Sequence, residues 1–272
     1  MSPRPVLRPG PRHRAQRGSH AVRMSLLILL MSLIITPTAA AGEEPSDLVA
    51  AWRIWSMRYH EEPARLDEIR EGLEQTINTN SHVENLLALA QVCFVWGDIR
   101  AKTRDEKLDA YDCGRRTAER VVELEPKNPT AHFLYATNTA RWGETKGLLG
   151  SLFLLPTVKK EMNIVINLDP YFTPVYALAG NVYYEVPPLF GGDLDKAEAM
   201  FRKGLEQDPT FTAMHVGLAK TLIKKGRSDE ARQELRTVLN EKQPRNLAEW
   251  TLKDSKEARE LLDSISDKSS DE

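Results

Sequence analysis

The strongest constraint on the fold is a repeat of 34 residues in the second half of the chain. The repeated positions pair Ala197 with Ala231, Phe201 with Leu235, Gly204 with Val238, and Pro209 with Gln243-Pro244. In such a unit, small residues let two antiparallel helices approach closely, large apolar residues fill the space between them, and the proline ends the second helix. Beyond Pro45, apolar residues recur three and four apart with almost no alternating stretch. The sequence therefore predicts an all-α fold of stacked helical hairpins.

Earlier units follow the same pattern with insertions. Their second helices end at Glu125-Pro126, Asp169-Pro170 and Asp208-Pro209, which lie 44 and 39 residues apart. Relative to a period of 34, ten and five residues are extra, and we place them at residues 143–156 and 186–192, where glycine and proline accumulate between the first (A) and second (B) helix. A weaker unit ends near Asn80. About five hairpins result, with long A-to-B insertions.

Both ends of the repeat region have their own signals. Ser46 is a candidate N-cap for a first helix whose apolar stripe we expect in the core. That stripe consists of Leu48, Trp52, Trp55 and Tyr59. After Pro244, a capping helix is expected over residues 247–265, with one apolar face made by Leu247, Trp250, Ala258, Leu261, Leu262 and Ile265. The helical domain then spans 42–265, and 266–272 is expected to be a disordered tail.

The first 41 residues indicate a cleaved secretory signal. An apolar run from Leu26 to Ile35 follows a basic leader and precedes Ala39-Ala40-Ala41, where small residues suit a signal peptidase. Cleavage after Ala41 would leave Gly42 as the first residue, so we expect an exported, periplasmic protein without a stable membrane anchor. Retention of the run as an anchor is the alternative.

Composition narrows the function classes. The chain has 272 residues and is 41% hydrophobic, which excludes wholesale disorder, collagen and a polytopic membrane protein. Six of its 37 basic residues lie in the first 41 positions, which hold no acidic residue, so the remainder carries 31 against 39, or −8. An acidic body argues against nucleic-acid binding.

Three motifs carry a resemblance to known families. They are Trp142-Gly143-Glu144-Thr145-Lys146-Gly147, then Val158-Lys159-Lys160-Glu161-Met162 leading to Asn167-Leu168-Asp169-Pro170, and Tyr183-Tyr184-Glu185-Val186-Pro187-Pro188 before Asp195-Lys196-Ala197. Over residues 86–265 the chain resembles the tetratricopeptide T component associated with tripartite ATP-independent periplasmic (TRAP) transporters and the related regulator of microtubule dynamics family. The resemblance implies a tetratricopeptide-like superhelix that engages a solute-binding protein and can assemble as a homo-oligomer.

Stacked hairpins expose a concave groove made by the A helices. The register selects Gln91, Phe94, Thr137, Arg141, Asn181, Tyr184, Glu185, Lys220 and Lys224 as groove residues. Arg141, Lys220 and Lys224 could hold a carboxylate, while Asn181 could pair with a peptide backbone and Tyr184 could supply a flat apolar contact. The alternative is that the lysines are only solvated and that Tyr184 belongs to the core.

The two insertions are further candidate contact sites. Residues 147–156 are more apolar than a free loop, with Leu152 and Phe153 among them, so they either fold into the core as extra helix or contact a partner chain or a membrane surface. The loop 186–192 is stiffened by prolines and carries Phe190 as a candidate anchor.

Catalytic and metal-binding signals are missing from the sequence. The histidines beyond the leader are scattered over different units, at His60, His82, His132 and His215, and no nucleophile or phosphate-loop motif occurs. We therefore expect neither an enzyme nor a cofactor or metal. Cys93 and Cys113 fall on two helices of the second unit, where a disulfide and two buried thiols are both compatible with the sequence.

Together these observations predict a non-enzymatic, exported, protein-binding adaptor. Its leading version docks an extracytoplasmic solute-binding protein in solute uptake, as the family resemblance implies. Two alternatives stay open: a general envelope-assembly scaffold, and a carrier of an apolar ligand in the groove.

Overall fold

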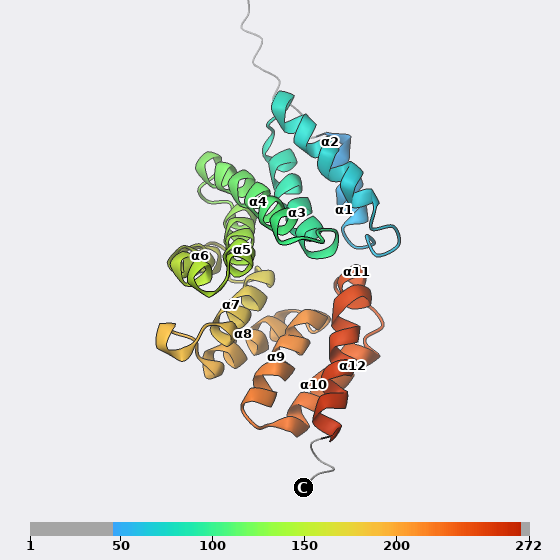
Figure 1. Cartoon of the computed structure of the whole chain (residues 1–272), viewed down its shortest axis with the longest axis vertical. Helices are drawn as coiled ribbons and strands as arrows, with labels where there is room; N and C mark the ends of the chain where they lie inside the picture. Colours follow the sequence, from blue (N-terminus) through green and yellow to red (C-terminus); the bar gives the residue numbers. More distant parts are fainter. Residues whose placement is uncertain (1–45, 268–272) are drawn as a thin grey trace, which may run out of the picture. The chain divides into compact units, whose positions relative to one another are not determined.

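The computed structural model describes residues 46–267, and these residues form helices joined by short connections (Figure 1). The elements are α1 (Asp47–Trp55), α2 (Arg65–Thr79), α3 (Val83–Ile99), α4 (Arg104–Leu124), α5 (Pro129–Lys146), α6 (Leu148–Leu168), α7 (Pro174–Glu185), η1 (Pro188–Phe190), α8 (Leu194–Gln207), α9 (Thr212–Lys224), α10 (Ser228–Asn240), α11 (Leu247–Glu249), η2 (Trp250–Asp254) and α12 (Ser255–Asp267). Helices α1 to α10 pack as consecutive hairpins, so the all-α repeat architecture expected from the sequence is confirmed. The leader and signal prediction and residues 268–272 lie outside the described residues. Within 46–267, none of the helices combines the length and the apolar character needed to cross a bilayer.

Polar side chains and prolines begin many of these helices. Thr103 forms a reciprocal capping box with Glu106 at α4, and the Asn128 side chain accepts the Ala131 N–H at α5. Ser46 is the N-cap of α1, but its hydroxyl and N–H both donate to Asn85 Oδ1 at 2.9 Å instead of its oxygen accepting a helix N–H. The first helix is therefore tied to the second hairpin at its first turn.

The two insertions have different structures. The ten extra residues around 143–156 lengthen α5 and α6, and Gly147, with φ 97°, makes the turn between them. Pro156 lies inside α6. The five extra residues around 186–192 do form an irregular connection, which contains the 3-10 turn η1.

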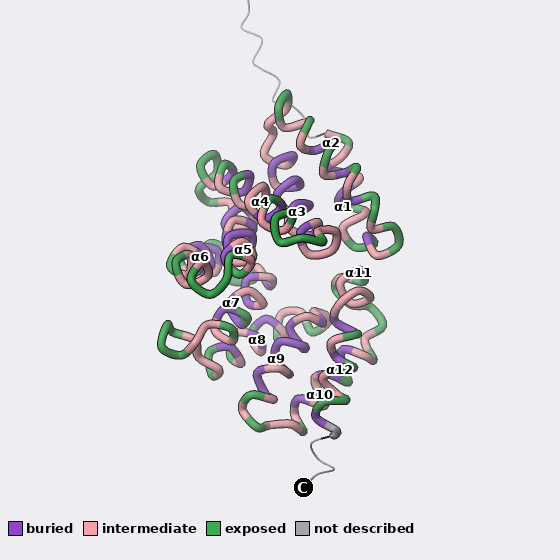
Figure 2. Tube along the Cα trace, in the orientation of Figure 1, coloured by how far each residue is buried: buried purple, intermediate pink, exposed green. Residues whose placement is uncertain are grey.

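Buried residues occur along most of the packed helices (Figure 2). Their side chains form the core between neighbouring helices. One cluster around Phe201 joins α6 to α10 with α12, and another around Trp52 joins α1 to α4. Of the expected first stripe, Trp52 and Tyr59 are fully buried, although Tyr59 lies beyond the end of α1. Leu48 and Trp55 pack against the same cluster.

The carboxyl-terminal capping segment is not one regular helix. A π-helical turn, η2, separates α11 from α12. A π turn changes the helical period and rotates the faces on its two sides. As a result Leu247, expected on the apolar face, is 41% exposed, and the neighbouring Ala248 is buried against the Trp52 cluster. The other expected positions, Trp250, Ala258, Leu261, Leu262 and Ile265, do pack against the Phe201 cluster.

Candidate binding surfaces

Helices α7 and α9 bring five of the expected groove residues together. We call this group, made of Asn181, Tyr184, Glu185, Lys220 and Lys224, the α7–α9 face. The ammonium of Lys224 lies 3.5 Å from the centre of the Tyr184 ring, and that of Lys220 lies 5.5 Å from it. Asn181 and Glu185 are exposed beside this stack. The tyrosine is half-buried and packs against the Phe201 cluster, and its ring also contacts the two ammonium groups.

The two lysines of this face differ in what they can still bind. Lys220 Nζ lies 3.0 Å from Glu257 Oε1 of α12. Burial alone would lower the pKa of Lys220, but the hydrogen bond and the charge of Glu257 outweigh it and raise the pKa. Lys220 is therefore already paired with a carboxylate of its own chain. Lys224 is exposed and contacts the Tyr184 backbone oxygen only at 3.5 Å, so its charge can still take an acidic group.

Arg141, the third expected carboxylate ligand, is paired as well. Its guanidinium donates to Asp98 Oδ1 at 2.6 Å and to Glu144 Oε2 at 2.8 Å. Asp98 also accepts from the Tyr111 hydroxyl at 2.6 Å and pairs with Lys253 of η2. Burial alone would raise the pKa of Asp98, but Lys253 and Arg141 outweigh it and lower the pKa to about 2. The carboxylate that Arg141 holds is thus internal.

Two of the three remaining expected groove residues lie in structural contacts. Gln91 Oε1 accepts a hydrogen bond from the Trp52 indole at 3.0 Å, and Phe94 packs in the Trp52 cluster. Thr137 is half-buried, and its hydroxyl has no hydrogen-bond partner among residues 46–267. These three residues do not join the α7–α9 face. The register identified helix A faces but could not tell which positions neighbouring units cover.

A second group of exposed apolar residues lies at the start of α6 and in the irregular connection after α7. Leu149 and Phe153 are 83% and 84% exposed, and Leu148, Leu189 and Phe190 are exposed too. We call these five residues the α6–η1 ridge. Lys159 of α6 donates to the Gly191 carbonyl at 3.4 Å, which links the helix to the η1 connection. The insertion is helical, as one alternative held, but Phe153 does not enter the core, and Leu152 is only half-buried.

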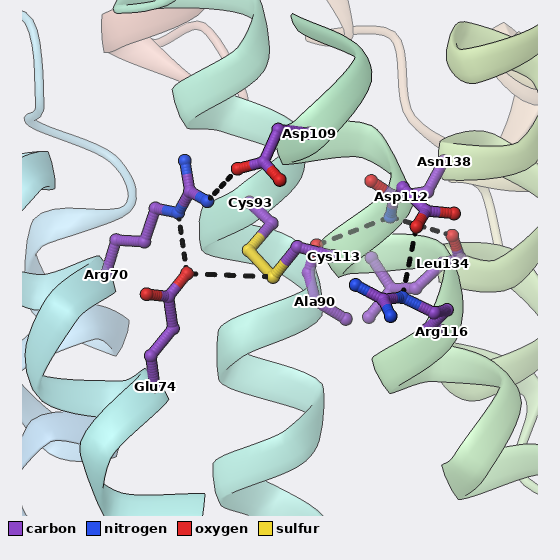
Figure 3. The surroundings of a disulfide bond; sticks show 10 residues. All are labelled: Arg70, Glu74, Ala90, Cys93, Asp109, Asp112, Cys113, Arg116, Leu134 and Asn138. Carbon is purple, nitrogen blue, oxygen red and sulfur yellow. Dashed lines mark hydrogen bonds and ion pairs between the residues drawn. A yellow bond between two sulfur atoms is a disulfide. The ribbon is translucent and has the colours of Figure 1, made fainter. Parts of the chain in front are cut away.

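The two cysteines lie in the second hairpin and join α3 to α4 (Figure 3). Cys93 and Cys113 form a disulfide, with their Cα atoms 6.3 Å apart. Glu74 Oε1 lies 3.9 Å from Cys113 Sγ and is also held by Arg70. Bonded sulfurs cannot serve as thiolate ligands, so this Glu-Cys-Cys group does not provide a metal site in the disulfide form.

Two of the four histidines beyond the leader share an arrangement that the sequence analysis missed. His132 Nε2 lies 3.0 Å from the Pro126 carbonyl and its Nδ1 lies 2.5 Å from Glu161. His215 repeats this with the Pro209 carbonyl at 3.0 Å and Glu234 at 2.6 Å. Each histidine follows its proline by six residues, which was visible in the sequence. Both act as structural links between a helix A, the preceding turn and a helix B.

Comparisons with known proteins agree with this architecture. Residues 191–253 match the tetratricopeptide repeat family, and residues 57–189 match the family described as regulator of microtubule dynamics protein 1-3. No curated protein sequence matches the chain.

Similar solved structures include a thermophilic tetratricopeptide protein of Thermus thermophilus, with 16% identity over 80% of this chain and 97% of that one and a TM-score of 0.59. A structure of MamA has 16% identity, covering 73% of this chain and 96% of that one, with a TM-score of 0.46. MamA from Desulfovibrio magneticus has 18% identity, covering 71% of this chain and 94% of that one, with a TM-score of 0.44. The fold of this chain is that of a tetratricopeptide repeat protein.

Proposed function

We propose that the chain is a non-enzymatic adaptor that binds an extended segment of a partner protein on its α7–α9 face. One observation carries the proposal: the Lys224–Tyr184 stack lies beside exposed Asn181 and Glu185, and neither of these two side chains has a hydrogen bond or ion pair with another described residue. Tetratricopeptide hairpins present their A helices as a binding surface.

Three groups of the face each match one feature of a peptide. The Asn181 amide has a donor and an acceptor and can pair with a peptide unit. Lys224 can hold a carboxylate, and the Tyr184 ring offers a flat contact for an apolar side chain. The face therefore favours a segment in which an acidic residue is close to an apolar one.

The finer version of the proposal is that the adaptor is exported and docks an extracytoplasmic solute-binding protein. The signal pattern of residues 1–41 supports export, and the resemblance over residues 86–265 supports the docking role. A general envelope-assembly scaffold, a carrier of an apolar ligand, and assembly of several copies through the α6–η1 ridge are the alternatives that the experiment must separate.

The test is affinity capture from an envelope fraction with the full precursor gene and a carboxyl-terminal tag. Wild type is compared with Asn181→Ala/Lys224→Ala and with Lys242→Ala, an exposed lysine outside the face. Each captured protein is then purified, and its affinity for the three chains is measured by calorimetry.

We expect wild type to capture a solute-binding protein. The affinity of that protein should be at least tenfold lower for the double variant than for wild type and less than twofold lower for the control. Capture of assembly proteins with the same pattern would keep the adaptor and replace its partner. Equal binding by all three chains would contradict the α7–α9 face as the site.

A further inference from the structure

A basic pocket of about 390 Å³ lies between the start of α4 and the end of α5, apart from the α7–α9 face. Its lining includes Lys102, Arg104, Lys107, Arg141, Glu144 and Thr145. Four of these are cationic and one is a carboxylate, in a chain whose residues 42–272 carry 31 basic against 39 acidic side chains. The pocket therefore concentrates positive charge in a protein body that is acidic as a whole.

Arg104 is fixed in the wall without being neutralised. Its guanidinium donates to the Thr145 carbonyl at 3.0 Å and to the Lys146 carbonyl at 3.4 Å. Carbonyl oxygens orient the planar group but carry no net charge, so the full positive charge remains. The end of α5 thus holds an arginine of α4 in place at the pocket.

Lys102 and Lys107 also retain their charge. Neither forms an ion pair with a carboxylate of a described residue. The nearby Glu106 accepts the backbone N–H groups of Thr103 at 2.9 Å and Lys102 at 2.6 Å, and these bonds, with a smaller contribution from the Lys102 charge, lower its pKa, so Glu106 keeps its negative charge close to Lys102 without forming an ion pair with it. Glu144, the one carboxylate of the lining, is paired with Arg141. Three positive charges of the lining therefore have no ion-pair partner within the described part of the chain.

We propose that this pocket binds a phosphomonoester, with the phosphate group held by Arg104, Lys102 and Lys107. Arg104 Nε and one Nη already donate to carbonyls, so its remaining N–H groups, together with the two flexible ammonium groups, would hold the phosphate. A phosphate dianion has more charge and more acceptor oxygens than a carboxylate and suits such a cluster better. The volume is within the range of about 300–1,000 Å³ typical of small-molecule sites, so it accommodates an organic group beside the phosphate. The site is independent of the peptide-binding proposal.

The test is calorimetric titration of the purified chain with O-phosphoserine, inorganic phosphate and serine at low salt. The variant Lys102→Gln/Lys107→Gln removes two lysine charges and leaves the Arg104 anchor intact, and Lys242→Gln is the matched control. Thermal unfolding of all three chains confirms that the substitutions leave the fold unchanged.

We expect saturable binding of O-phosphoserine that is tighter than that of inorganic phosphate, is undetectable for serine and weakens as salt increases. The double variant should bind at least tenfold more weakly, and the control should change less than twofold. Equal affinity for inorganic phosphate would overturn the phosphomonoester assignment. Absence of binding, or equal weakening in the control, would overturn the site itself.

Discussion

At the residue scale, the histidines show what spacing can and cannot reveal. His132 and His215 each follow a proline by six residues, so the contact to the proline carbonyl could have been found from the sequence. Their glutamate partners could not, because Glu161 follows His132 by 29 residues and Glu234 follows His215 by 19. The lengthened α5 and α6 change the separation while the geometry stays the same.

The His215 link predicts a pH-dependent stability. Burial alone would lower the pKa of His215, but its hydrogen bonds to Glu234 and to the Pro209 carbonyl outweigh burial and raise the pKa above 6.5. A histidine whose pKa is higher in the folded than in the unfolded chain stabilises the fold fully at pH values below its unfolded pKa. This stabilisation is lost as pH rises through its folded pKa. We expect the free energy of unfolding to fall over that interval in wild type and to fall less in His215→Gln.

The measurement is urea unfolding from about pH 5.5 to about pH 9, a range that brackets the ordinary histidine pKa. His82→Gln is the control, because that imidazole caps α3 at its surface and has no carboxylate partner in the described part of the chain. Parallel pH profiles for wild type and His215→Gln would contradict the prediction.

At the element scale, hairpin packing was the most predictable feature. The 34-residue pattern placed Phe201 and Gly204 on the inner side of one helix, and both are buried there. The pattern did not reveal that glycines on both neighbouring helices make room for Phe201. A Cβ at Gly180 of α7 or at Gly217 of α9 would lie 2.5 Å from the Phe201 ring.

We therefore expect Gly217→Ala to destabilise the chain by about 1–3 kcal/mol, because the added methyl group overpacks against the ring. Chemical denaturation measures the loss. In the double variant Gly217→Ala/Phe201→Leu the smaller side chain relieves the clash, so its destabilisation should be less than the sum of the single changes. If the two destabilisations add strictly, the Phe201 ring is not the cause of the loss in Gly217→Ala.

The α6–η1 ridge was the least predictable element. Glycine and proline around residues 143–156 suggested a loop, yet a single glycine at positive φ makes the turn and the rest is helix. A helix fixes the direction of its side chains, so Leu149 and Phe153, four residues apart, lie on one exposed face.

Because Phe153 is exposed, Phe153→Asp should change the free energy of unfolding by no more than about 0.5 kcal/mol while reducing self-assembly or partner capture. Denaturation, light scattering and capture measure the three quantities. A matched change, Asn163→Asp at another exposed position of α6, tests whether added charge alone is responsible. Unchanged assembly and capture in Phe153→Asp would show that the ridge is only scaffold.

At the scale of the whole molecule, the carboxyl-terminal segment contacts the first two hairpins. Lys253 pairs with Asp98, which is 155 residues earlier, and the Ala248 N–H donates to the Met57 carbonyl at 3.2 Å. The same segment reaches the last hairpins, since Thr212 donates to Asp254 at 2.6 Å and Trp250 donates to the Val238 carbonyl at 2.8 Å. A repeat period describes neighbours only, so no sequence pattern predicted this long-range contact.

Lys253→Met should lower the free energy of unfolding by about 1–3 kcal/mol. The loss is smaller than for a buried carboxylate left without any partner, because Asp98 keeps its hydrogen bonds from Arg141 and Tyr111. The variant should also move the pKa of Asp98 upward from about 2. A carboxyl group whose pKa is lower in the folded than in the unfolded chain stabilises the fold above its unfolded pKa, and this stabilisation is lost as pH falls through its folded pKa. Because the variant raises the folded pKa of Asp98, its acid unfolding midpoint should lie at a higher pH. Lys256→Met, an exposed lysine of α12, is the control, and equal midpoints would contradict the pairing.

The contact between Asp98 and Lys253 also bears on the order in which the chain can mature. An open array of repeats can form from its first unit onward, each unit docking on the one before. Here the buried carboxylate of the second hairpin can meet its lysine only after that residue, 155 positions later, has left the ribosome. A nascent chain ending before residue 247 would hold five hairpins whose first members lack this contact.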